Sequence, residues 1–193
     1  MKLEWAHIQT VSSKSYTCGF CSRPLASEKA YSAKNSHTGQ SAFIYICHHC
    51  QKPTFFDVND KQTPGSKFGD DVLGIDDEKV KHLYQEARGS FSNNAFTATV
   101  LCCRKLLMHI SVSKGAEEGK SFVEYVEFLS SNNYVPPDAR GWVDHIRKKG
   151  NEANHEILIM SEEEAKDLIS FSEMLLKLTY EFPATSKKYN VSE

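Results

Sequence analysis

Cys18-Gly19-Phe20-Cys21 and Cys47-His48-His49-Cys50 are the two stretches that decide how this chain of 193 residues folds. Each CxxC stretch places two thiol groups on one tight turn, and together they supply four sulfur ligands. Four sulfurs form the tetrahedral ligand set of a structural zinc site. We therefore expect one structural zinc ion per chain, which replaces the hydrophobic core that so short a segment cannot form.

The predicted ligands are Cys18, Cys21, Cys47 and Cys50. Four protein ligands leave no open position for a substrate, so this zinc would be structural and not catalytic. Redox-active or simply buried cysteines are the alternative, but a redox CxxC follows a strand in a βαβ unit, and the sequence shows no such pattern. His48 and His49 can replace a cysteine as ligand, although we expect them to be exposed and to face a partner.

Composition places the chain among soluble globular proteins. It has 40% hydrophobic and 25% charged residues and a formal net charge of −2, so it is not a polycation that coats nucleic acid. The sequence contains neither an apolar stretch of about 20 residues nor a signal peptide. We therefore expect a cytoplasmic protein without a membrane partner, in which reduced cysteines bind metal and do not form disulfides.

Hydrophobic periodicity predicts a mainly α fold: a small β zinc ribbon followed by an all-α bundle of about five helices. The β-branched and aromatic stretch 41–46 predicts a strand that leads into the second CxxC. From Asp76 onward the period changes from two to about three and a half. The expected organisation is a ribbon over 1–56, a linker over 57–75, a helical bundle over 76–182 and a C-terminal tail over 183–193.

Within the expected bundle, residues 94–113 are apolar on most sides and predict a central helix. Two capping boxes, Ser121 with Glu124 and Ser161 with Glu164, predict where later helices begin. Cys102 and Cys103 lie on the apolar helix, where small core residues are the ordinary interpretation.

A second group of polar residues lies in Ile146-Arg147-Lys148-Lys149-Gly150-Asn151-Glu152-Ala153-Asn154-His155. Arg147 can grip a phosphate with two hydrogen bonds, and His155 can transfer a proton near neutral pH. Asn151 can orient either group. These residues suggest a phosphate-handling site without a metal, although an Arg and a His near a helix end more often cap the helix or make surface contacts.

The same stretch resembles a helical domain of unknown function that is often attached to restriction-enzyme subunits. The resemblance covers residues 76–182 and rests on three segments: Leu83-Tyr84-Gln85-Glu86-Ala87, Cys103-Arg104-Lys105-Leu106-Leu107, and the R..GN.A.H pattern from Arg147 to His155. That domain is similar to the HEPN superfamily, many of whose members are metal-independent ribonucleases that act as dimers. Gly150 stands before Asn151, where the commonest HEPN motif has the arginine.

The resemblance implies a metal-independent endoribonuclease of toxin or anti-phage defence type, in which Arg147, Asn151 and His155 form the catalytic site. His155 would transfer the proton, Arg147 would stabilise the charge on phosphorus, and the RNA product would carry a 2′,3′-cyclic phosphate. The implied partners are an RNA substrate, a second copy or a higher homo-oligomer, and a protein trigger sensed by the zinc ribbon. The alternative is a non-catalytic adaptor whose ribbon binds nucleic acid or protein and whose degenerate HEPN domain dimerises.

Overall fold

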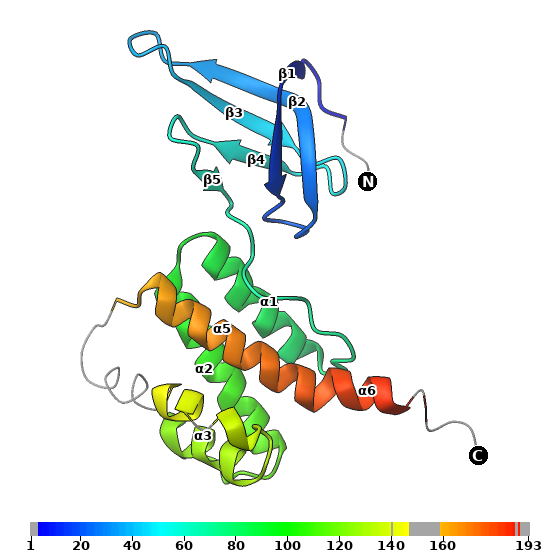
Figure 1. The fold of residues 1–193 in the computed structure, drawn as a ribbon, viewed down its shortest axis with the longest axis vertical. Helices are drawn as coiled ribbons and strands as arrows, with labels where there is room; N and C mark the ends of the chain where they lie inside the picture. The colour runs from blue at the N-terminus through cyan, green and yellow to red at the C-terminus, as the bar shows by residue number, and fades with distance from the viewer. Residues whose placement is uncertain (1–3, 140, 147–158, 188, 190–193) are drawn as a thin grey trace. The chain divides into compact units, whose positions relative to one another are not determined.

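The computed structural model of the protein describes residues 4–139, 141–146, 159–187 and 189. The chain divides into two compact units, which are described separately (Figure 1). The ribbon unit comprises residues 1–67 together with 92–94. The helical unit comprises residues 68–91 and 95–193.

The ribbon unit is a five-stranded antiparallel sheet in which neighbours in sequence are neighbours in space, in the order β1-β2-β3-β4-β5. Its strands are β1 (Gln9–Thr17), β2 (Pro24–Lys34), β3 (Ser41–Ile46), β4 (Pro53–Phe56) and β5 (Gln62–Thr63). The strand expected over 41–46 is confirmed as β3. The chain between the two CxxC turns folds back as a long hairpin, β2–β3, which pairs Ala30 with Tyr45.

The prediction of a mainly α fold was wrong, because this sheet extends over residues 9–63 and makes the protein a mixed α and β structure. The sequence concealed β1 and β2 because both strands are mostly exposed and are rich in Ser and Lys. In β2 only Leu25, Ser27 and Ala30 are buried, so its apolar alternation is weak.

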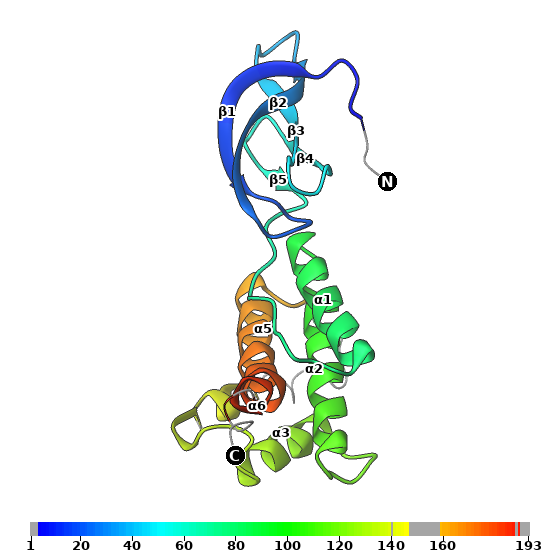
Figure 2. The ribbon, with the colours of Figure 1, turned by 90° about the vertical axis from the view of Figure 1, so that its right-hand side faces the viewer.

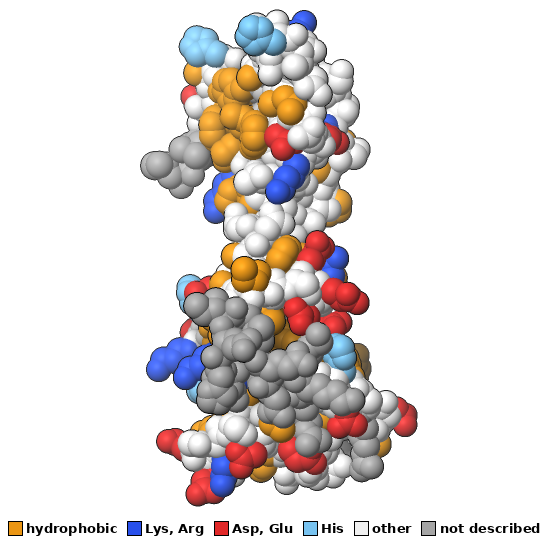
Figure 3. Space-filling view, turned by 90° about the vertical axis from the view of Figure 1, so that its left-hand side faces the viewer, with side chains coloured by type: hydrophobic (Ala, Val, Ile, Leu, Met, Phe, Trp, Pro, Cys, Tyr) orange, Lys and Arg blue, Asp and Glu red, His pale blue; other side chains and the backbone are white. Residues whose placement is uncertain are grey.

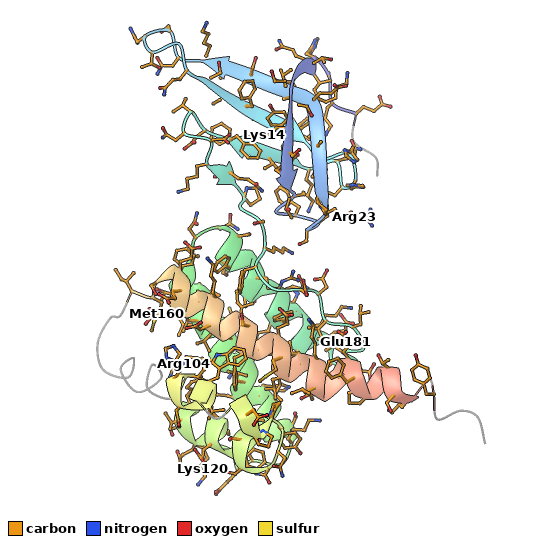
Figure 4. The ribbon with its side chains drawn as sticks, viewed as in Figure 1. Lys14, Arg23, Arg104, Lys120, Met160 and Glu181 are labelled. Atoms are coloured by element: carbon orange, nitrogen blue, oxygen red, sulfur yellow. The ribbon has the colours of Figure 1, made fainter. Side chains whose placement is uncertain are left out.

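Three aromatic rings fill the inner face of the sheet. The ring of Phe56 lies 5.2 Å from that of Tyr16 and 5.7 Å from that of Tyr45, both in edge-to-face geometry. Lys14, labelled in Figure 4, covers this cluster with its ammonium group 4.5 Å from the Phe56 ring centre. These rings and the buried Cys18 and Cys47 belong to one small core.

The helical unit is built around two long helices that pack on each other, α2 (Phe96–Ser113) and α5 (Glu162–Leu176) (Figure 2). Around them lie α1 (Glu78–Ser92), α3 (Phe122–Ser131), the 3₁₀ turn η1 (Pro137–Ala139), a helix over 141–146, the π turn η2 (Lys177–Glu181) and α6 (Phe182–Lys187). On α2, Cys103, Leu106, Leu107 and Ile110 are fully buried, in agreement with the predicted central helix. No helix in the described part of the chain is long and apolar enough to cross a membrane.

Both predicted capping boxes are confirmed. The backbone N–H of Glu124 donates to Ser121 Oγ at 3.3 Å, and the N–H of Ser121 donates back to Glu124 Oε2 at 2.8 Å. Ser161 and Glu164 exchange the same two hydrogen bonds at the start of α5. Each pair satisfies two N–H groups that would otherwise lack partners at a helix start.

The segment 57–75, expected as a linker, takes part in both units. It contributes β5 to the sheet, and Val72 and Ile75 are buried in the helical core. Arg88 on α1 holds the second half of the segment, because its guanidinium donates to the carbonyls of Phe68 at 3.0 Å and Gly69 at 2.6 Å. At the other end of the chain, residues 183–187 continue α6, although they were expected in the tail.

Candidate metal centre

The four predicted cysteine ligands converge. Their sulfur atoms all lie within 4.8 Å of one another, and the two cross-turn pairs, Cys18 with Cys50 and Cys21 with Cys47, are 3.7 and 3.8 Å apart. A tetrahedral ion with metal–sulfur distances of about 2.3 Å requires sulfur–sulfur distances of about 3.8 Å. The four thiols therefore fit a single tetrahedral metal ion.

The first CxxC turn, with the two residues after it, forms a closed knuckle. The N–H of Ser22 donates to the Cys18 carbonyl at 2.8 Å, and the N–H of Cys18 donates to the Arg23 carbonyl at 3.0 Å. Ser22 has a φ of +56°, which turns the chain back toward Cys18. The turn needs Gly19, since a Cβ atom there would lie 2.3 Å from the carbonyl oxygen of Gly65.

The second CxxC turn repeats this geometry. The N–H of Gln51 donates to the Cys47 carbonyl at 2.8 Å, the N–H of Cys47 donates to the Lys52 carbonyl at 3.1 Å, and Gln51 has a φ of +60°. The two knuckles therefore match position by position, so that Phe20 corresponds to His49 and Arg23 to Lys52.

The electrostatics of the four thiols favour a bound cation. Burial opposes ionisation of Cys47, but hydrogen bonds from the backbone N–H groups of Cys50 and His49 and from the Cys50 and Cys21 thiols together lower the pKa of the Cys47 thiol. For Cys50, burial and the neighbouring Cys18 thiol raise the pKa to about 12. The Cys47 thiol is thus prepared to ionise while burial raises the pKa of Cys21 and Cys50, and a positive ion among the sulfurs would favour the thiolate form of the ligands.

The side chains on the knuckles form an exposed cluster, which we call the knuckle surface: Phe20, Arg23, His48, His49 and Lys52. The rings of His48 and His49 lie 4.2 Å apart. Partial desolvation and the nearby charges of His48 and Arg23 lower the pKa of His49. Exposure of His48 and His49 agrees with the sequence-based expectation, whereas the cations beside them were missed. The signal was available, because each cation is the second residue after a CxxC.

The two units differ in charge. Residues 1–67 hold eight Lys and Arg against four Asp and Glu, a formal charge of +4, while the rest of the chain holds 15 against 21, or −6. On the face shown in Figure 3, acidic side chains are numerous over the helical unit. Within the described residues, neither Arg23 nor Lys52 forms an ion pair with a carboxylate.

The predicted catalytic residues Arg147, Asn151 and His155 lie outside the residues that the structure describes, as do Lys148, Lys149 and Gly150. In the described chain before them, His145 Nε2 lies 3.0 Å from Asp167 Oδ2 on α5. No local motif marks this pair in the sequence, because the histidine and the aspartate lie 22 residues apart.

A small pocket of the helical unit is lined by residues of α2, α3 and α5 together with Ile146 and Met160. At this pocket the Arg104 guanidinium, labelled in Figure 4, lies 4.6 Å from the centre of the Phe122 ring. Burial lowers the pKa of Arg104. In the sequence, Ile146 directly precedes the segment 147–158, which contains the predicted catalytic residues, and Met160 lies two residues after it.

Comparison with known proteins yields one match. The sequence model of a domain of unknown function, DUF4145, matches residues 85–192, more than half of the chain. No curated protein and no solved structure shows significant similarity.

Proposed function

The chain belongs to the DUF4145 family, whose function is unknown, and on that premise we propose a function from the chain's own residues: a ribbon folded by zinc binds nucleic acid and tethers it to the helical domain. The observation that carries this proposal is the convergence of four thiols within 4.8 Å. Four sulfurs in tetrahedral arrangement favour zinc among biological metals, although they also suit iron. The closed ligand set makes the ion structural.

Charge supports nucleic acid as the partner of the ribbon. A unit with a formal charge of +4 attracts a polyanion, whereas the helical unit at −6 repels it. The ribbon is therefore the part of the molecule that would make first contact. We place this function in the cytoplasm, where thiols remain reduced and available to zinc.

Metal analysis and a binding assay test this proposal together. We expect one zinc ion per purified chain, and binding of a fluorescent single-stranded oligonucleotide that weakens as salt is raised. The variant Cys47→Ser/Cys50→Ser should lose both zinc and binding. Cys102→Ser is the matched control, because Cys102 lies on α2 outside the sulfur cluster, and it should keep both. Wild-type protein that holds zinc but binds no oligonucleotide at low salt would refute the proposal.

A second candidate function is a metal-independent endoribonuclease of toxin or anti-phage defence type. This proposal rests on the resemblance of the R..GN.A.H pattern to the HEPN motif, and Arg147, Asn151 and His155 of that pattern lie within the matched region. In this proposal His155 moves the proton between the 2′-hydroxyl and the leaving oxygen, and Arg147 stabilises the extra charge on phosphorus. Asn151 orients either group. The proposal includes a homodimer or higher homo-oligomer, and a trigger received through the ribbon.

Cleavage of RNA without added metal tests the second candidate. The expected products carry 2′,3′-cyclic phosphates, and DNA should resist cleavage because it lacks the 2′-hydroxyl. Arg147→Ala and His155→Ala should each slow cleavage at least about 100-fold, within the range of a lost proton-transfer or charge-stabilising group. His109→Ala, which removes an exposed histidine on α2, is the control and should cleave normally. Equal rates for all four proteins would rule out this assignment and favour the non-catalytic adaptor.

A further inference from the structure

Two contacts join the knuckles, and in each of them a cation from one knuckle lies beside an aromatic ring of the other. Lys52, from the second knuckle, places its ammonium 4.9 Å from the centre of the Phe20 ring in the first. Arg23, from the first knuckle, places Nη1 3.4 Å from Nδ1 of the His49 ring in the second. Phe20 corresponds to His49, and Arg23 corresponds to Lys52. In both contacts, therefore, the second residue after one CxxC meets the ring that precedes the second cysteine of the other CxxC. The metal centre therefore presents two equivalent pairs, each of one cation and one aromatic ring.

Both pairs are exposed although their backbones are tightly held. Phe20 is 37% exposed, and Arg23, His49 and Lys52 are exposed as well. Each knuckle backbone is closed by its own hydrogen bonds and by the cysteine ligands. A partner that binds here meets groups that are already in place, so little ordering entropy is lost on binding.

We propose that the two cation–ring pairs bind successive nucleotides of a single-stranded nucleic acid, with each cation on a phosphate and each ring against a base. This inference rests on the proposed nucleic-acid function of the ribbon and names the surface that would perform it. Arg and Lys are the usual phosphate ligands, and an aromatic ring stacks on any unpaired base. Duplex would bind less well, because its base faces are covered by the neighbouring pairs.

The knuckle surface adjoins a groove, because His48 belongs to both. His48 lines this groove of about 310 Å³ together with Trp5, Glu28, Lys29 and Gln51. Trp5 is fixed there, because its Nε1–H donates to the Gln51 carbonyl at 3.0 Å. Glu28 disfavours a phosphate at this point but can accept a hydrogen bond from a base amino group. The groove therefore suits a base of a neighbouring nucleotide.

The binding test uses a fluorescein-labelled oligothymidylate of about 20 nucleotides, long enough to cover several such contacts. This probe cannot be cleaved by a ribonuclease that requires a 2′-hydroxyl. The full-length variant Arg23→Gln/Lys52→Gln removes the two phosphate contacts and should weaken binding at least tenfold. It should also lower the slope of log affinity against log salt by about 1.4, since each contact to single-stranded DNA contributes about 0.7.

The matched control is Lys34→Gln/Lys61→Gln, which removes the same charge from two exposed ribbon lysines outside the knuckles. It should change affinity less than threefold. A third variant, Phe20→Leu, should weaken binding about tenfold through lost stacking but leave the salt slope unchanged. Zinc content is measured for every variant, so that a loss of fold is separated from a loss of contact.

The outcomes distinguish failure of the proposed nucleic-acid function from failure of the proposed role of the knuckle surface. Wild-type protein that ignores the probe overturns the proposed function itself. Wild-type binding that the knuckle and control variants weaken equally overturns only this inference, because the ribbon would then attract nucleic acid through its overall charge. Equal affinity for the single strand and for its duplex with oligodeoxyadenylate also overturns it, because stacking on the rings requires free base faces.

Discussion

The ribbon unit and the helical unit have cores of different size and composition. In the described residues, the ribbon core consists of seven buried residues, of which Cys18 and Cys47 are predicted metal ligands. The helical core has 23 buried residues, nearly all aliphatic or aromatic. A small sheet cannot bury enough apolar surface to offset its conformational entropy, whereas the helical unit can. We therefore expect the ribbon to depend on a bound ion, whereas the helical unit depends on side-chain packing.

This contrast also separates function from stability. In the ribbon, four thiols converge between two turns whose outward side chains remain exposed. In the helical unit, the long helices α2 and α5 direct their apolar faces toward each other. Removal of the metal from the ribbon, and of single side chains from the helical unit, tests whether the two units are stabilised independently.

The largest effect is expected from removal of the metal. Extraction with a strong chelator should unfold the ribbon, since structural zinc contributes about 10 kcal/mol or more to such small domains. Hydrogen exchange measured by mass spectrometry should show residues 9–63 losing protection, while α2 and α5 keep theirs. Simultaneous loss of protection in both units would contradict the separation of their stabilities.

A cavity in the helical core should produce the next largest effect. Leu106 on α2 is fully buried, so Leu106→Ala should lower the free energy of unfolding of the helical unit by about 3 kcal/mol in urea titrations. Leu101, on the same helix, is 60% exposed, and Leu101→Ala should change it by less than about 0.5 kcal/mol. Both variants should keep their zinc. Zinc loss from Leu106→Ala would show that the ribbon depends on the helical core.

Arg88→Met should destabilise the helical unit by a smaller amount, about 2 kcal/mol. Arg88 is 1% exposed, and its loss leaves the carbonyls of Phe68 and Gly69 without their donor. Hydrogen exchange should increase in residues 68–72 before it increases elsewhere. The control Lys81→Met removes an exposed cation from the same helix and should have almost no effect. An unchanged exchange rate in 68–72 would show that Arg88 does not anchor this segment.

The smallest effect concerns pH. Hydrogen bonds from the side chain and backbone of Ser121 lower the pKa of Glu124 below its ordinary value of 4.5. A pKa lowered by folding stabilises the native state above the ordinary value, and this contribution is lost as pH falls through the folded pKa. Glu124→Gln should therefore be slightly less stable than wild type at pH 7, with the difference vanishing at acid pH. A difference that stays constant with pH would exclude the ionised capping box as its cause.

Local patterns predicted a substantial part of the structure. The capping boxes at Ser121 and Ser161, strand 41–46 and the central helix α2 were predicted because each depends on interactions within a few residues. The four cysteines likewise came together as their spacing predicted. The first two strands escaped prediction because most of their residues are exposed and polar, so the apolar alternation that marks a half-buried strand is weak.

The features of the candidate site also divide into those set by local sequence and those set by contacts between distant segments. The sequence by itself determined each pair of thiols, since a CxxC turn brings its two cysteines together through local geometry, and the tertiary structure brought the two pairs into one cluster. Only the tertiary structure decided that the equivalent cations Arg23 and Lys52 each meet a ring on the opposite knuckle. It also decided that 57–75 is held by Arg88 and by burial of Val72 and Ile75 rather than left free. The physical reason is that contacts between distant segments depend on how the chain packs, which short-range residue patterns do not encode.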